Sequence, residues 1–163
     1  MCGIVGLFLK DPALQPRLGA LMAPMLAEMT ERGPDSAGFA IYRDGAQRPT
    51  LSCLGPLGTD WKAVAASLTQ ATGAAVEVET IADHALLRVW GELRAARAHL
   101  IETFPQVTVT ASGEAIEIFK GVGDPMEVAR TFGLETRSGT HGIAHTRMAT
   151  ESAVTISGSH PFS

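Results

Sequence analysis

The 163-residue sequence contains no asparagine, only two cysteines and no long apolar run. Cys2 and Cys53 cannot build the disulfide framework of a small secreted protein, and they form neither a CxxC metal site nor a CxxC redox pair. We therefore expect a reducing compartment, the cytoplasm. No apolar stretch approaches the roughly 20 residues that span a bilayer. The start, MCGIVGLFLKDP, lacks the basic region of a secretory signal.

Basic runs are also absent, and the net charge is −4. This balance argues against nucleic acid as a partner, and the short apolar runs argue against a membrane. A chain of this length with 45% hydrophobic residues is long enough to bury the core of a globular domain.

The spacing of apolar residues predicts an α+β domain. Helical periodicity is expected at 11–33, 59–71, 91–105 and 124–134. Strand patterns begin the chain and precede HTRMAT, and hairpins are expected at 36–55, around Asp44-Gly45, and at 106–121, around Ser112-Gly113. Local hairpins favour antiparallel sheets over a doubly wound parallel sheet.

The cysteine at position 2 is the first candidate for chemistry. If Met1 is removed, Cys2 carries a thiol with a pKa of about 8.5 and an α-amine with a pKa of about 7.7–8.0. One residue then holds both a nucleophile and a base suited to neutral pH. The structural alternative is a small residue in a buried first strand.

Three further stretches carry residues suited to binding or catalysis. They are RGPDSAG (32–38), HTRMAT (145–150) and SHPF (159–162). Taken singly, each has a structural explanation: a turn, a surface cation at Arg147, and a loop histidine at His160.

Together with Cys2, these stretches resemble the class II glutamine amidotransferase domains of the N-terminal-nucleophile hydrolases. The resemblance covers residues 1–45 and 140–163. It implies a four-layer αββα sandwich with two antiparallel sheets, spanning 1–163, with 59–136 as a small α+β insertion. The pattern says little about what that insertion does.

The resemblance implies glutamine as substrate. Cys2 would attack the side-chain amide, expel ammonia and leave a γ-glutamyl thioester, which water cleaves to glutamate. Arg147 is the expected bidentate partner of the substrate carboxylate. Thr150 would add a hydroxyl donor, and His160 falls where the family often has a substrate-side histidine.

Two more residues are carried over from the family's loop beside the nucleophile. Arg32 and Gly33 are expected to shape the binding site rather than to do chemistry. His141 and His145 have an HxxxH spacing, but on a strand these positions lie about 13 Å apart, so we expect no metal site. No cofactor fingerprint is present, and we expect no cofactor in this chain.

The missing asparagine matters once the family is considered. The family's oxyanion donors come from an asparagine-glycine pair downstream of HPF, and such donors stabilise the transition state by about 2.7–4 kcal/mol each. We therefore expect the domain to be C-terminally incomplete. A separate chain or a further segment would complete the site.

The run HTRMATESAV…GSHPF is most similar to stand-alone amidotransferase subunits of glutamate synthase-like enzymes, including N-methylglutamate synthase. This implies a hetero-oligomer in which ammonia passes to a partner synthase subunit. The alternative is a non-catalytic glutamine-sensing or structural subunit with the same fold. The missing oxyanion donors favour that alternative, and the presence of Cys2, Arg32 and Arg147 opposes it.

Overall fold

The computed structural model describes residues 2–44, 48–148 and 160–161. The chain divides into two compact units, which are described separately. The first unit contains Met1–Asp44 and Ile118–Phe162, and the second contains Gly45–Glu117. Among the described residues, every helix is too short or too polar to cross a membrane.

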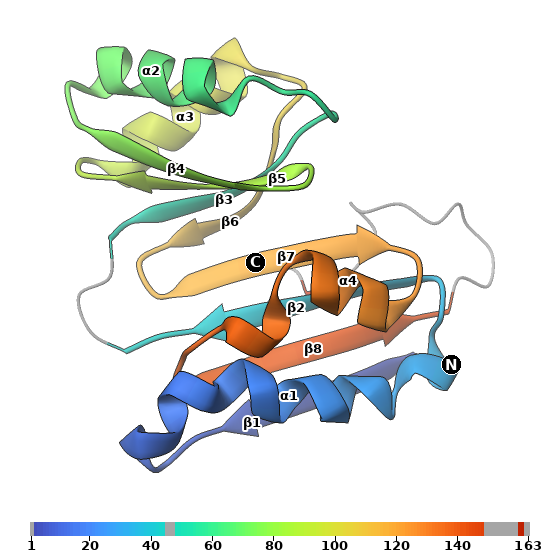
Figure 1. The fold of residues 1–163 in the computed structure, drawn as a ribbon. Helices are drawn as coiled ribbons and strands as arrows, with labels where there is room; N and C mark the ends of the chain where they lie inside the picture. The colour runs from blue at the N-terminus through green and yellow to red at the C-terminus, as the bar shows by residue number, and fades with distance from the viewer. Residues whose placement is uncertain (1, 45–47, 149–159, 162–163) are drawn as a thin grey trace. The chain divides into compact units, whose positions relative to one another are not determined.

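The first unit is built on a four-stranded sheet with two α-helices on one face (Figure 1). The strand order is β1 (Gly3–Phe8), β8 (His141–Arg147), β2 (Ser36–Tyr42) and β7 (Ile116–Val122). β8 pairs antiparallel with both β1 and β2. β8, which carries HTR, therefore lies between β1, which follows Cys2, and β2, which begins within RGPDSAG.

Helix α1 (Leu18–Ala27) packs on β1 and β8, and helix α4 (Pro125–Thr131) packs on β2. Leu18, Met22 and Leu26 recur every four residues and are buried, so one apolar stripe of α1 faces the sheet. The helix predicted over 11–33 is divided in the structure. The 3₁₀ turns η1 (Pro12–Arg17) and η2 (Thr30–Arg32) flank α1, and a third, η3 (Leu134–Thr136), follows α4.

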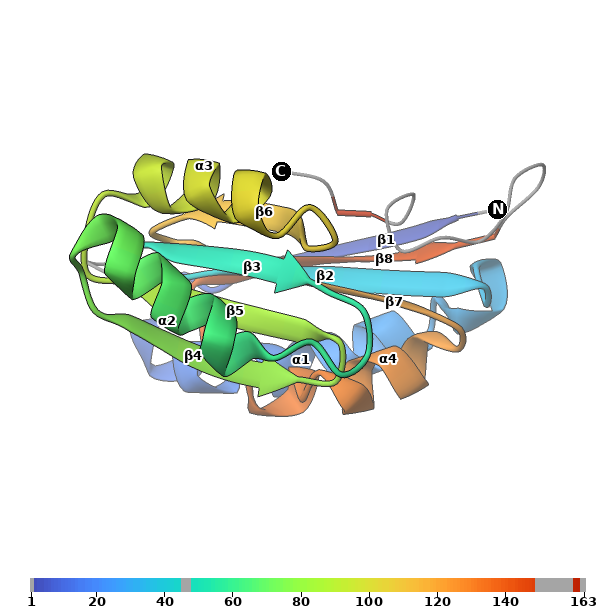
Figure 2. The ribbon, with the colours of Figure 1, turned by 90° about the horizontal axis from the view of Figure 1, so that it is seen from above.

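The second unit has the element order βαββαβ. Its elements are β3 (Thr50–Leu54), α2 (Trp61–Thr72), β4 (Val76–Ile81), β5 (His84–Val89), α3 (Leu93–Thr103) and β6 (Thr108–Gly113). The sheet order β4-β5-β3-β6, with antiparallel neighbours, is that of a split βαβ or ferredoxin-like motif. Figure 2 shows α2 and α3 on the same face of this sheet.

Capping side chains explain where the two helices of the second unit begin. The Asp60 carboxylate accepts a hydrogen bond from the Ala63 N–H, and the Glu92 carboxylate accepts one from the Ala95 N–H. The helices then bury apolar side chains against the sheet. The core contains Leu51, Cys53, Trp61, Val64, Leu68, Ala85, Leu87, Val89, Ala96, Leu100 and Val107.

Both predicted hairpins are wrong. β2 and β3 lie in different sheets, and so do β6 and β7, because each pair of consecutive strands passes from one unit to the other. Among the described residues, consecutive strands form a hairpin at β4–β5 instead. Its two-residue turn is Ala82-Asp83, with Ala82 at φ 54°, and this pair is not one of the usual turn dipeptides.

The second unit covers 45–117, whereas the sequence pattern marked 59–136 as an insertion. The stretch at 125–136 packs against α1 in the first unit. The described residues thus form an α+β structure with two sheets of antiparallel character. The four-layer αββα arrangement stays a prediction.

Candidate active site

The start of β1 and the end of β8 meet at one edge of the first sheet. Gly3 is paired with Thr146, and Ser36 at the start of β2 is paired with Arg147. Cys2 precedes Gly3, so continuing the antiparallel register brings it opposite Arg147. The topology therefore places the candidate nucleophile and the candidate substrate-binding arginine at the same sheet edge.

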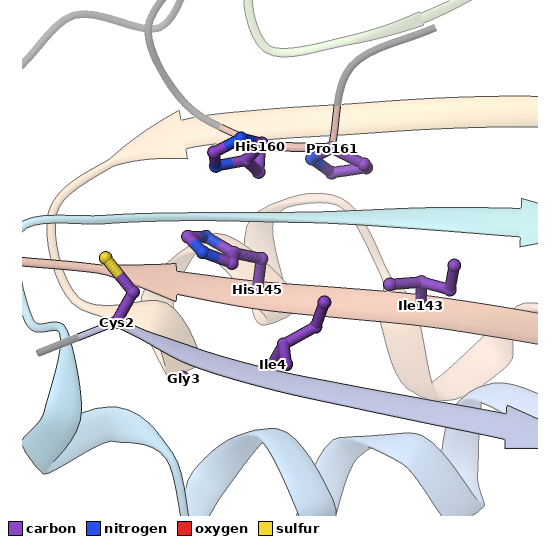
Figure 3. Close-up of a pocket in the computed structure, with 7 residues that line it drawn as sticks. All are labelled: Cys2, Gly3, Ile4, Ile143, His145, His160 and Pro161. Atoms are coloured by element: carbon purple, nitrogen blue, oxygen red, sulfur yellow. The ribbon is translucent and has the colours of Figure 1, made fainter.

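A cavity of about 520 Å³ opens beside Cys2 (Figure 3). Its lining residues are Cys2, Gly3, Ile4, Ile143, His145, His160 and Pro161. Gly142 on β8 faces Met22 of α1, so its neighbour Ile143 and the next alternate residue, His145, point to the opposite face of the sheet. The cavity thus lies on the sheet face that α1 does not cover.

The side chain of Cys2 is exposed to solvent, and Figure 3 shows its sulfur on the side of the cavity that holds the two imidazoles. Cys53 is a useful contrast, because it lies in the core of the second unit and burial raises the pKa of its thiol to about 12. Of the two thiols, Cys2 alone is both accessible and next to a cavity.

The imidazoles of His145 and His160 contact each other edge to face, with ring centroids 4.6 Å apart and an interplanar angle of 62°. Burial lowers the pKa of His145, and its electrostatic interactions with His160 and Arg147 lower it further. His145 is therefore neutral at pH 7. Arg147 follows His145 by two residues on β8, on the same face of the strand, but is not one of the lining residues.

Gly33 brings the RGPDSAG segment onto the end of β8. A Cβ atom at Gly33 would lie 2.5 Å from the Arg147 nitrogen, so a larger residue would push the two backbones apart. Pro34 forms a bridge with Arg147, and the Asp35 N–H donates a hydrogen bond of 3.1 Å to the Arg147 carbonyl. The segment thereby fixes the backbone of the candidate substrate-binding arginine.

Gly38 allows a similar close approach by the backbone of His160. A Cβ atom there would overlap the His160 carbonyl oxygen and would lie 2.9 Å from the Phe119 carbonyl oxygen. Gly38 is also the residue paired with His145 across β2 and β8. His160 therefore lies over the sheet at the same level as His145.

Two of the six residues that the sequence singled out, Cys2 and His160, line the cavity. Gly33 lies against the backbone of Arg147 at the end of β8. Arg32 is exposed at the end of η2 and does not line the cavity. Thr150 lies outside the described residues. The roles assigned to these residues stay predictions.

His145 is a site residue that the sequence considered only as half of an HxxxH pair. The other half, His141, stacks on Tyr42 with ring centroids 4.3 Å apart and does not line the cavity. Within the described residues, no group of three or more His, Cys, Asp or Glu could hold a metal ion. The sequence did carry one signal for His145. It lies two residues before Arg147 in a predicted strand, and residues two apart on a strand point to the same face.

We predict that Gly38→Ala displaces the His160–Pro161 segment or destabilises the first unit, because the new Cβ has no room. Overpacking of this kind costs about 1–3 kcal/mol. Gly6→Ala is the matched control, since its Cβ would meet its nearest neighbour at an ordinary 3.9 Å. Urea denaturation measures both variants, and equal stabilities of Gly38→Ala and Gly6→Ala would contradict the close approach.

Comparison with known proteins adds to this geometry. No protein-family model matches the chain. It is 45% identical over 167 residues to "Glutamine amidotransferase-like protein GlxB" of Rhizobium meliloti, covering 100% of this chain and 55% of the relative. It is 32% identical over 174 residues to "Putative glutamine amidotransferase" of Methanothermobacter thermautotrophicus, covering 99% of this chain and 56% of the relative. The chain spans about half the length of these relatives, and over that length it is similar to proteins named as glutamine amidotransferases or as like them.

Proposed function

We propose that this chain provides the nucleophile and substrate-binding part of a glutamine amidotransferase of class II, with an N-terminal cysteine nucleophile. The observation that carries the proposal is the position of Cys2, an exposed thiol near the chain start that lines a cavity at the sheet edge where Arg147 lies. The similarity to glutamine amidotransferase-like proteins over the whole chain supports it.

The proposed reaction uses both functional groups of Cys2 after removal of Met1. The α-amine accepts the thiol proton, directly or through a water, as the sulfur forms a bond to the amide carbon of glutamine. The same proton then goes to the amide nitrogen as the carbon–nitrogen bond breaks, so ammonia leaves and a γ-glutamyl thioester remains. Water cleaves the thioester to glutamate and restores the thiol.

Arg147 is proposed to bind the α-carboxylate of glutamine. A guanidinium presents two parallel N–H groups that match the two oxygens of a carboxylate. The backbone of Arg147 is fixed by the contacts of Gly33, Pro34 and Asp35 described above, which limits the positions that its side chain can reach. His160 and Thr150 are proposed to contact the substrate, and Arg32 to shape the adjoining loop.

Donors for the oxyanion are proposed to come from polypeptide outside these 163 residues. The sequence contains no asparagine, and the relatives are almost twice as long as the segment they share with this chain. The ammonia is proposed to pass to a partner synthase of the glutamate synthase or N-methylglutamate synthase kind. The four-layer αββα sandwich belongs to the same proposal.

The absence of asparagine also favours a second candidate, a glutamine-binding subunit without catalytic activity. The two candidates differ in what they require of Cys2. An enzyme needs the thiol for every turnover, whereas a sensor needs only the binding residues.

We predict that Cys2→Ala lowers ammonia release from glutamine by roughly a thousandfold or more, because the nucleophile of every turnover is lost. The assay uses the full-length protein with its partner subunits. Cys53→Ala is the matched control and is expected to retain activity, since the Cys53 thiol is buried and protonated. Equal ammonia release by the wild type and Cys2→Ala would exclude the enzyme and favour the glutamine-binding subunit.

We predict that Arg147→Gln raises the KM for glutamine by roughly tenfold or more, because a hydrogen-bonded charged partner contributes about 1.5–3 kcal/mol. The value of kcat is expected to change less, since the carboxylate is held equally in the ground state and the transition state. Arg130→Gln serves as control, because Arg130 forms an exposed ion pair with Glu127 on α4. An unchanged KM in Arg147→Gln would contradict the assignment.

A further inference from the structure

His145 lies on the same sheet face as the cavity and between two groups that the proposed function uses. Along β8 it is two residues before Arg147. Its ring contacts the His160 ring, with the centroids 4.6 Å apart. Figure 3 shows the His145 and His160 rings next to each other on the side of the cavity nearest the Cys2 sulfur. Cys2, His145 and His160 all line this cavity, so a change at His145 that moves the His160 ring would also change the cavity beside Cys2.

Two contacts hold the His160–Pro161 segment against the sheet. One is the backbone contact with Gly38, which allows the His160 carbonyl to approach β2. The other is the ring contact with His145, the residue paired with Gly38 on the neighbouring strand. The first contact fixes the distance of the segment from the sheet, and the second can fix the orientation of the His160 ring.

The surroundings of His145 suit a packing role rather than proton transfer from the thiol. Its Nδ1 atom is buried and has no hydrogen-bond partner among the described residues. Burial and the electrostatic interactions with His160 and Arg147 disfavour its protonated form. A neutral ring can lie edge-on against His160, whereas an imidazolium at this position would be repelled by the Arg147 guanidinium.

We propose that His145 is a positioning residue for the Cys2 pocket, whose ring orients His160 so that His160 forms the wall of the pocket beside the Cys2 sulfur. This rests on the proposed function, because it assigns a role to His160 in the glutamine site. His145 acts through His160 and is not assigned a contact with the substrate.

The experiment is a double-mutant cycle on the full-length protein, with His145→Ala, His160→Ala and the double variant. Two rates are measured at Cys2: labelling by an electrophilic glutamine analogue, and reaction with a bulky aromatic disulfide reagent that does not resemble glutamine. Edge-to-face ring pairs contribute about 0.5–1.5 kcal/mol, so each single variant should change both rates by roughly two- to tenfold. Analogue labelling should slow, and the bulky reagent should react faster as the wall opens.

The cycle should be non-additive, with the double variant close to either single variant, because both substitutions remove the same contact. His145→Phe keeps a ring at this position and should restore most of the wild-type rates. His141→Ala is the matched control, since His141 is on the same strand and face but outside the cavity lining. If His145→Ala does not fold, as judged by circular dichroism, His145→Gln takes its place in the cycle.

Additive effects in the cycle would overturn the inference. Equal changes of the two rates in His145→Phe and His145→Ala would also overturn it, because they would point to the ring nitrogens instead of the ring contact. An effect of His141→Ala as large as that of His145→Ala would also overturn it. Failure of the proposed function looks different: wild-type Cys2 would then show no preferential labelling by the glutamine analogue, while the bulky reagent would still report the coupling between His145 and His160.

Discussion

The candidate site depends on close backbone contact at two glycines. Gly33 lets the loop before β2 lie against the Arg147 backbone, and Gly38 lets the His160 backbone lie against β2. Because a Cβ atom at either position would overlap neighbouring atoms, both contacts require glycine. Together with the antiparallel register of β1 on β8, they bring segments from both ends of the sequence to one sheet edge, beside Cys2.

Local order in this chain could be read from the sequence where local interactions decide it. The helical periodicity at 59–71 and 91–105 and the strand pattern leading into HTRMAT mark elements that the structure contains. Strand pairing could not be read in the same way. Turn signals such as Asp44-Gly45 say that the chain bends, but β2 then pairs with β8, about a hundred residues later, and not with the strand that follows it.

The site shows the same division between local and long-range information. Cys2, Arg147 and His160 were predicted from motifs, and the fold brings them towards one cavity although the sequence places His160 far from Cys2. His145 was not predicted: its position two residues before Arg147 on one strand was a weak local signal, and its significance lies in a tertiary contact with His160. Its HxxxH spacing suggested a pair with His141, yet that residue stacks on Tyr42 outside the cavity lining.

The proposed function requires that the working nucleophile is an amino-terminal cysteine. Mass spectrometry of the purified native protein, with fragmentation of its first peptide, tests this claim most directly. The mature chain is expected to begin at Cys2 with a free α-amine. A chain that keeps Met1, or whose terminal amine is blocked, would contradict it, because Cys2 would then have no amine of its own to accept the thiol proton.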